Sequence, residues 1–210
     1  TQIQYGNGVS TAYTYDSKMF RLTRIYSSNA SNLLLQDLNY TYDSLGQVLK
    51  ITDNANTGGN SMTQTFTYDE LNRLKSASGA YGSKTYTYDA IGNMLSSSDS
   101  LGNTTTFTYE PNFNRIASVT DPLGNTTRYS YDTRGNLVST TDPGGNVTTK
   151  SYNSLGLLVE TTDPLGNRTR LSYDSFGNVV QATNATGDNI SFVFDAVSRV
   201  TETIDALGRK

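Results

Sequence analysis

The stretch 129–138 reads Tyr-Ser-Tyr-Asp-Thr-Arg-Gly-Asn-Leu-Val, which is the pattern of two strand ends joined by a tight turn. Asp132 can accept hydrogen bonds from the backbone of its own turn, and Gly135 can take the positive φ angle that closes the turn. The two tyrosines are two positions apart, so they share one face of the incoming strand. The stretch therefore predicts the tip of an antiparallel β-hairpin.

The same cassette recurs along the whole chain, and such self-similarity decides the architecture of a repeat protein. The second aromatic position of the cassette occurs nine times, first 26 or 27 residues apart and then 20 to 22 apart, at Tyr15, Tyr42, Tyr68, Tyr88, Tyr109, Tyr131, Tyr152, Tyr173 and Phe194. A second turn, Asp-Pro-Leu-Gly-Asn at 121–125 and 163–167 and Asp-Pro-Gly-Gly-Asn at 142–146, lies between the cassettes. Proline sets φ at its second position and glycine supplies a left-handed residue, so this too is a hairpin turn.

From Asp89 onward the two turn types alternate every 10 or 11 residues, which leaves room for a turn of about four residues and a strand of about six. The sequence therefore predicts an all-β fold of consecutive antiparallel hairpins, with no helix. Glycine stands three residues after the first turn residue at most of these turns, with Phe113 and Ser198 as exceptions. The predicted structural repeat residues are Tyr42, Asp43, Gly46, Tyr88, Asp89, Gly92, Asp121, Gly124, Tyr131, Asp132, Gly135, Asp163, Gly166, Tyr173, Asp174 and Gly177.

The lengths of the repeats predict the domain organisation. Residues 1–210 form a single array of nine cassettes, in which 1–61 are longer, irregular repeats and 62–210 are regular repeats of about 21 residues. The long tip at 53–60 is the most flexible candidate segment. The chain opens in strand-like sequence and ends within a turn at 205–210, so we expect both ends to be truncated from a longer array.

Composition restricts the chemistry that the chain can perform. Among 210 residues there is no Cys, His or Trp, only 17% are charged, and the net charge is −3. Without imidazole or thiol groups the sequence predicts no catalytic, cofactor-binding or metal-binding residue, and the acidic residues are assigned to turn hydrogen bonds. The absence of a basic cluster argues against a nucleic-acid partner, and the absence of a run of 18 apolar residues predicts no membrane span.

Alternation along the strands predicts which side chains share a face. Tyr129 and Tyr131 are expected to face one way and Ser130 the other, with Leu137 and Val138 on opposite faces of the returning strand. Equivalent strands would align the cassette tyrosines in a ladder. We interpret that ladder as packing, although phenol hydroxyls could also face sugars or an enclosed chain.

The cassette Tyr-x-Tyr-Asp-x-x-Gly-x-apolar, as at 40–48 and 86–94, resembles the YD repeat of the RHS (rearrangement hotspot) proteins, whose relatives include toxin-complex B and C components, wall-associated proteins and teneurins. The resemblance covers essentially the whole chain. It implies a β-sheet of consecutive hairpins that spirals into a solenoid-like RHS shell. It further implies export, to the extracellular space or the bacterial cell surface, and a shell that commonly encloses a toxic C-terminal domain.

The first functional hypothesis is a structural scaffold that is not an enzyme, with the remainder of the same shell and an enclosed toxin domain as its partners. Two alternatives remain. The aromatic face could bind carbohydrate or a protein surface, or unpaired edge strands could assemble copies of the chain into an extracellular β-fibre.

Overall fold

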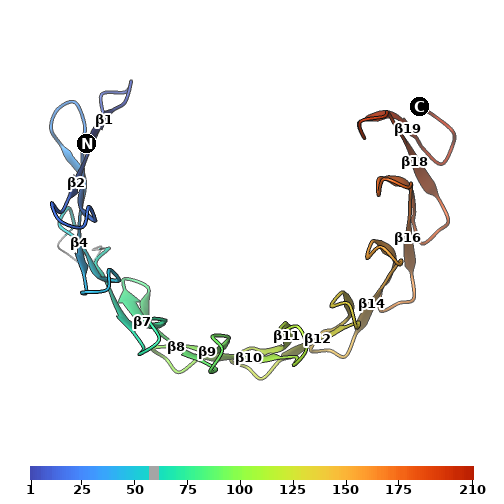
Figure 1. Ribbon diagram of the computed structural model, residues 1–210, viewed down its shortest axis with the longest axis horizontal. Coiled ribbons are helices and arrows are strands. Elements are labelled where there is room, and N and C mark those ends of the chain that lie inside the picture. The colour runs from blue at the N-terminus through green and yellow to red at the C-terminus, as the bar shows by residue number, and fades with distance from the viewer. Residues whose placement is uncertain (57–61) are drawn as a thin grey trace. The chain divides into compact units, whose positions relative to one another are not determined.

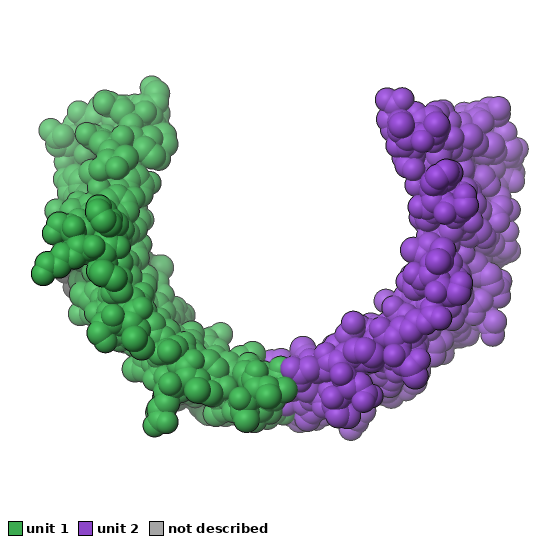
Figure 2. Space-filling view, in the orientation of Figure 1, with its two compact units in different colours: residues 1–106 green, residues 107–210 purple. Residues whose placement is uncertain are grey.

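The computed structural model describes residues 1–56 and 62–210, and these residues form nineteen β-strands joined by turns, without a helix (Figure 1). The predicted all-β fold of antiparallel hairpins is therefore confirmed. Residues 57–60 of the tip predicted to be flexible lie outside the described residues. The chain divides into two compact units, residues 1–106 and 107–210 (Figure 2).

In the first unit each strand pairs antiparallel with the next strand in sequence. The strand β10 reaches from this unit into the second. The strands are β1 (Gln2–Gln4), β2 (Ser10–Tyr15), β3 (Leu22–Ser28), β4 (Leu34–Tyr42), β5 (Val48–Asp53), β6 (Gln64–Tyr68), β7 (Leu74–Gly79), β8 (Gly82–Tyr88), β9 (Met94–Asp99) and β10 (Thr104–Tyr109).

In the second unit the strands from β11 to β19 pair in the same consecutive manner. The sequence places a boundary between longer repeats at 1–61 and regular repeats at 62–210, and this division stays a prediction. The strands are β11 (Ile116–Thr120), β12 (Thr126–Tyr131), β13 (Leu137–Thr141), β14 (Val147–Tyr152), β15 (Leu158–Thr162), β16 (Arg168–Tyr173), β17 (Val179–Thr183), β18 (Asn189–Phe194) and β19 (Val200–Ile204).

The turn between β12 and β13 shows the geometry that most hairpins share. The amide of Asp132 donates to the carbonyl of Asn136 over 2.9 Å, and the amide of Gly135 donates to the carbonyl of Asp132 over 2.9 Å. This is a three-residue loop whose last residue is left-handed, and Gly135 has φ +83°. Without a glycine, Ser198 takes φ +60° itself, whereas the longer turn at Glu110 gives that role to Asn114 at φ +57°.

Eight of the nine cassette hairpins carry a β-bulge beside the turn. In the β12–β13 pair, Tyr131 is opposite Leu137 and Ser130 is opposite Ser139, so Val138 has no partner. A bulge of this kind turns two consecutive side chains to the same face. Leu137 lies on the face of Tyr131 and Ser139 on the face of Ser130, so strict alternation fails in this strand, and the expected face of Val138 stays a prediction.

The two faces of the sheet differ in chemistry. Residues that pair across strands share a face, so the register places Tyr129, Tyr131 and Leu137 on one side, here named the tyrosine face. The other side, the hydroxyl face, carries the run of cross-strand neighbours Ser130, Ser139, Thr149 and Thr162.

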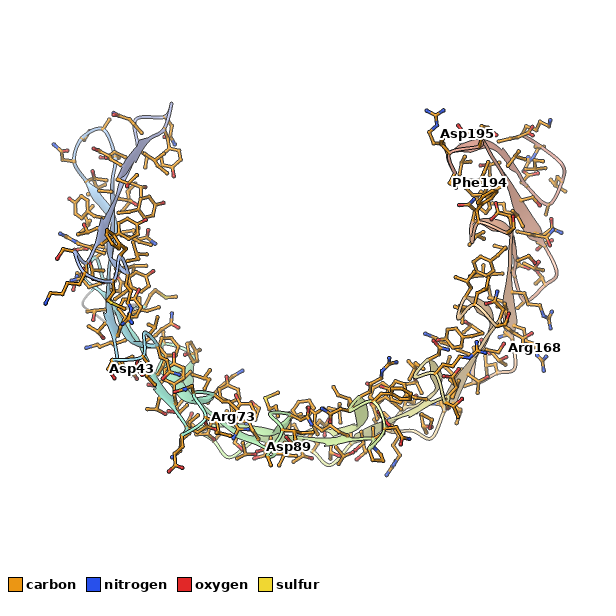
Figure 3. All side chains as sticks on the ribbon, in the orientation of Figure 1. Asp43, Arg73, Asp89, Arg168, Phe194 and Asp195 are labelled. Atoms are coloured by element: carbon orange, nitrogen blue, oxygen red, sulfur yellow. The ribbon has the colours of Figure 1, made fainter. Side chains whose placement is uncertain are left out.

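Hydroxyl groups on the hydroxyl face bond one another across strands. Examples are Thr65 with Ser78 and Thr67 with Ser76, both at 2.6 Å between oxygens. In the second unit, Phe194 of the tyrosine face and Arg168 of the hydroxyl face lie on opposite sides of the ribbon (Figure 3). The sheet therefore presents one apolar and one polar surface.

Little of either unit is buried in the manner of a globular core. Among the described residues, Ala77 is the only buried hydrophobic residue, at 5% exposure. The tyrosines, leucines and valines of the tyrosine face are mostly half-buried among their neighbours. Each unit is thus one layer of sheet whose order depends on turns and on contacts between neighbouring hairpins.

We expect the left-handed turn position to be costly for any residue with a Cβ atom. Gly166 has φ +86° and open space where a Cβ would stand. Gly166→Ala therefore measures the cost of the left-handed backbone conformation without a steric clash. The free energy of unfolding, measured by urea denaturation with circular dichroism, should fall by about 1 kcal/mol. Gly166→Asn should lose less, since Asn72 adopts φ +66° in an equivalent turn.

Gly6→Ala is the matched control, because Gly6 lacks a positive φ and has no atom near a Cβ position. Equal losses for the three variants would show that the left-handed conformation does not limit the residue at position 166.

Candidate functional site

A carboxylate at the first position holds most of the turns closed, and the turns at Asn153 and Asn184 use a side-chain amide oxygen in its place. Asp132 Oδ1 accepts hydrogen bonds from the amides of Arg134 (2.9 Å) and Asn136 (2.8 Å), and Oδ2 accepts one from the side-chain amide of Asn136 (2.9 Å). These bonds from Asn136 are the main reason that the pKa of Asp132 is held below its ordinary value. The carboxylate is therefore ionised at neutral pH and committed to its own turn.

The other predicted turn residues occupy the same positions. Asp43 accepts the amides of Leu45 and Gln47, both at 2.9 Å. Asp89, Asp121, Asp163 and Asp174 each accept two backbone amides and the side-chain amide of an asparagine four residues on. The partner glycines have φ between +86° and +100°, at Gly46, Gly92, Gly124, Gly166 and Gly177.

The second tyrosine of a cassette connects its hairpin to the preceding one. The Tyr131 hydroxyl donates to the backbone carbonyl of Ile116 over 2.9 Å, at the start of the returning strand one repeat earlier. We name this bond the tyrosine latch. It recurs at 2.7 to 2.9 Å from Tyr42 to Leu22, Tyr68 to Val48, Tyr88 to Leu74, Tyr152 to Leu137 and Tyr173 to Leu158.

Burial favours the protonated form, which can donate, in three of the latch tyrosines. It raises the pKa of Tyr42, Tyr88 and Tyr131, and the arginine beside each ring opposes the shift without cancelling it. Each latch hydroxyl thus gives its hydrogen to the sheet. The sequence alone left these hydroxyls open as sugar contacts, but in the structure their donor function is already used.

Three arginines that the sequence pattern did not single out each cover a latch. Arg115 places its guanidinium carbon 5.5 Å from the centre of the Tyr131 ring, and it lies 2.9 Å from where a Cβ on Gly135 would stand. Arg21 covers Tyr42 and Gly46 in the same way. Because the guanidinium is the end of a flexible side chain and can move, the positive φ remains the main constraint on Gly46 and Gly135.

Arg73 covers the Tyr88 ring at 4.8 Å and donates to the carbonyl of Asp89 over 2.6 Å. The available signal was an arginine immediately after the left-handed residue of a turn, where five other cassettes have Asn, Gln or Leu and the last cassette has Arg199. Its role could not be read from the sequence, because the ring that it covers belongs to the following cassette.

Two open grooves flank the latches. One of about 520 Å³ is lined by Asp69, Arg73, Lys75, Tyr86 and Tyr88, among others. Asp69 and Arg73 form an ion pair there, with 2.7 Å between Arg73 Nε and Asp69 Oδ2, so both charges are paired within their own turn. A smaller groove of about 280 Å³ lies between the turn at Glu110 and the tyrosines 129 and 131.

In the described ranges, no three Asp or Glu residues are grouped so that they could hold a metal ion. Every buried side-chain nitrogen or oxygen in the same ranges has a hydrogen-bond partner. Buried polar groups where neighbouring hairpins meet therefore form their hydrogen bonds within the chain. Within residues 1–56 and 62–210 there is also no helix of the length and hydropathy needed to cross a membrane.

Removing one latch hydroxyl should destabilise the chain without changing its fold. Tyr131→Phe keeps the ring under Arg115 but leaves the Ile116 carbonyl without this donor, at an expected cost of about 1 kcal/mol. The control is Tyr129→Phe, since the Tyr129 hydroxyl has no hydrogen-bond partner in the described structure. Urea denaturation should separate the two variants, and equal midpoints would contradict a stabilising latch.

Comparison with known sequences follows the repeat along nearly the whole chain. A family profile described as teneurin YD-shell matches residues 1–206. Toxin subunit YenC1 of Yersinia entomophaga is 38% identical over 89 residues, which is 37% of this chain and 9% of that protein. Toxin subunit YenC2 of the same organism is 40% identical over 85 residues, 35% of this chain and 9% of that protein. The matched stretches thus span about a tenth of the length of these relatives.

Among solved structures, a chain of the Photorhabdus luminescens Tc holotoxin pore aligns with 99% of this chain and 14% of its own length, at 20% identity and a TM-score of 0.49. The predicted resemblance to RHS and YD-repeat proteins is confirmed by the family match. Because that match extends over residues 1–206 of 210, the chain belongs to the teneurin YD-shell family.

Proposed function

We propose that this chain is a non-catalytic wall segment of an exported YD-repeat shell, and that the shell encloses a C-terminal toxin domain or other cargo. Membership of the YD-shell family gives the structural role. The relatives YenC1 and YenC2 are named as toxin subunits, which supports the toxin cargo and the extracellular or cell-surface location proposed for this chain.

The observation that carries the proposal is the unequal chemistry of the two faces. The hydroxyl face satisfies itself through pairs such as Thr87 with Ser96, at 2.6 Å. The tyrosine face carries aromatic and aliphatic side chains such as Tyr129, Tyr131 and Leu137 that are only half-buried. An apolar sheet face normally packs against a second layer, and the described chain supplies none. Enclosed cargo on the tyrosine face would provide that cover.

Contacts between successive hairpins can hold an extended sheet together, which a shell wall requires. Each latch connects one hairpin to its predecessor, as Tyr152 does to Leu137 and Tyr173 does to Leu158. Stability then accumulates from nearest-neighbour contacts along the repeat, so a wall of any length can be built from one unit. The turn carboxylates, which are the obvious candidates for acid–base catalysis in this chain, are already bonded to turn amides, and a scaffold role requires no other chemistry of them.

Site-specific photo-crosslinking in the full-length polypeptide tests which face meets the cargo. A benzophenone amino acid at position 129 lies on the tyrosine face and leaves the Tyr131 latch intact, and the same probe at position 130 lies on the hydroxyl face. The probe at 129 should crosslink to the C-terminal region of the same polypeptide, as identified by mass spectrometry. The probe at 130 should not.

Crosslinks to the C-terminal region from position 130 alone would place cargo on the hydroxyl face and contradict the proposal. Absence of such crosslinks from both positions would contradict enclosure by this part of the wall.

A further inference from the structure

One position on the tyrosine face interrupts the apolar pattern of the repeat. The residue two places before the second aromatic position of a cassette is aromatic in seven of the nine cassettes and leucine in an eighth. In the cassette of β14 it is a lysine. The nine residues are Tyr13, Tyr40, Phe66, Tyr86, Phe107, Tyr129, Lys150, Leu171 and Phe192. The sheet thus carries a cation where its other repeats carry a ring or an aliphatic chain.

The strand register places Lys150 on the tyrosine face. It pairs with Thr161, one step from the pair of Thr149 with Thr162, which belongs to the hydroxyl face. Because successive side chains of a strand point to opposite faces, Lys150 shares the face of Tyr152. Residues 107–210 are all described, and in their strands Lys150 is the only charged residue on the tyrosine face. The other charged strand residues of this unit lie on the hydroxyl face, at Arg128, Glu160, Arg168, Arg170 and Glu202.

Lys150 has no ion-pair or hydrogen-bond partner among the described residues. The residue is half-buried. Glu160, on the adjacent strand, lies on the other face and binds Arg170 over 2.7 Å. The turn carboxylates Asp142 and Asp163 accept amides of their own turns. The chain therefore leaves one positive charge uncompensated on the apolar surface of this unit.

The first unit shows that the sheet can place an acid beside a lysine of this face. Lys84 shares the tyrosine face with Tyr86, two residues on, and it pairs with Asp99 of the following strand. Across the following strand Lys150 meets Thr161 instead. The counter-ion of Lys150 therefore has to come from outside the described wall.

Covering the tyrosine face changes the energetics of Lys150. In water the ammonium group is hydrated, but burial under an apolar surface removes that hydration and strongly disfavours the charge. A buried ammonium is tolerated when a carboxylate binds it in good geometry. Cargo that packs on this face therefore has to bring an anion to Lys150, and a polypeptide supplies it as an Asp or Glu side chain.

We propose that Lys150 forms an ion pair with an aspartate or glutamate of the C-terminal cargo of the same polypeptide. The inference rests on the proposed function, because it requires cargo on the tyrosine face. It adds the chemistry of the partner surface, which is apolar opposite Tyr129 and Leu171 and acidic between them. The pair also selects the position of the cargo, because an acidic residue placed elsewhere on the tyrosine-face strands of this unit finds no cation.

Zero-length crosslinking of the full-length polypeptide tests the ion pair. A carbodiimide activates a carboxylate, and an amine in direct contact with that carboxylate then forms an amide without a spacer. Mass spectrometry of the folded, treated protein should find Lys150 Nζ joined to an Asp or Glu of the C-terminal region. Lys50 is the matched control, since it pairs with Thr65 on the hydroxyl face, and it should form no such amide.

Amides from Lys150 only to carboxylates of residues 1–210, or no amide at all, would overturn the proposal. An amide to a second copy of the chain, which would appear as a covalent dimer, would assign the counter-ion to self-association and overturn it as well.

Charge variants test the same contact with the benzophenone probe at position 129 of the full-length polypeptide. Lys150→Glu should lower the yield of crosslinks to the C-terminal region by roughly fivefold or more, whereas Lys150→Arg should retain the yield. Arg128→Glu is the control, because it reverses an exposed charge on the hydroxyl face and should leave the yield unchanged. Equal yields for Lys150→Glu and Arg128→Glu would contradict the ion pair.

Lys150→Leu replaces Lys150→Glu if circular dichroism shows that the charge reversal unfolds the chain. Leucine is accepted at this position, as Leu171 shows in the next cassette. The yield should still fall, because the acid of the cargo loses its partner.

The two proposals can fail separately. Crosslinks from position 129 to the C-terminal region with no amide at Lys150 would overturn the ion pair and leave the wall proposal intact. Absence of both products would overturn both proposals, because no cargo would then cover the tyrosine face.

Discussion

The structure depends on one local constraint, which is that a three-residue hairpin loop must find acceptors for its own amides at an exposed edge. A carboxylate at the first position provides them, because one oxygen accepts the amides two and four residues on, as Asp163 does from Leu165 and Asn167. A left-handed residue at the fourth position then lets the chain reverse. With both conditions met at most turns, the hairpin needs no buried core beneath it.

The remaining features of the sheet follow from that turn. The bulge beside the cassette turn leaves Val159 without a partner and pairs Leu158 with Tyr152 on the tyrosine face. It also positions the carbonyl of Leu158 as the acceptor of the next latch, from Tyr173. Turn, bulge and latch together produce a single layer with an apolar side and a polar side. That asymmetry is the physical basis for proposing a wall with cargo on one side.

The sequence was sufficient for the fold class and the family because both are set by local spacing. The interval from Asp132 to Gly135 and its recurrence require no knowledge of neighbours in space. The bulge at Val138 could not be predicted, since alternation assumes that every residue has a partner across the strand. The Tyr131 latch and the contact of Arg115 with the Tyr131 ring could not be predicted from the sequence either. Each joins residues of two successive repeats, and the bulge sets the offset between those repeats.

Turn carboxylates, rather than a buried core, hold the hairpins, and amide hydrogen exchange followed by NMR tests this most directly. The amide of Asn136 lies at an exposed turn but donates to Asp132, whereas the neighbouring amide of Thr133 has no acceptor in the described structure. We expect the Asn136 amide to exchange much more slowly than that of Thr133, and Asp132→Ala to abolish the difference. Equal exchange of the two amides in the wild-type chain would contradict this account.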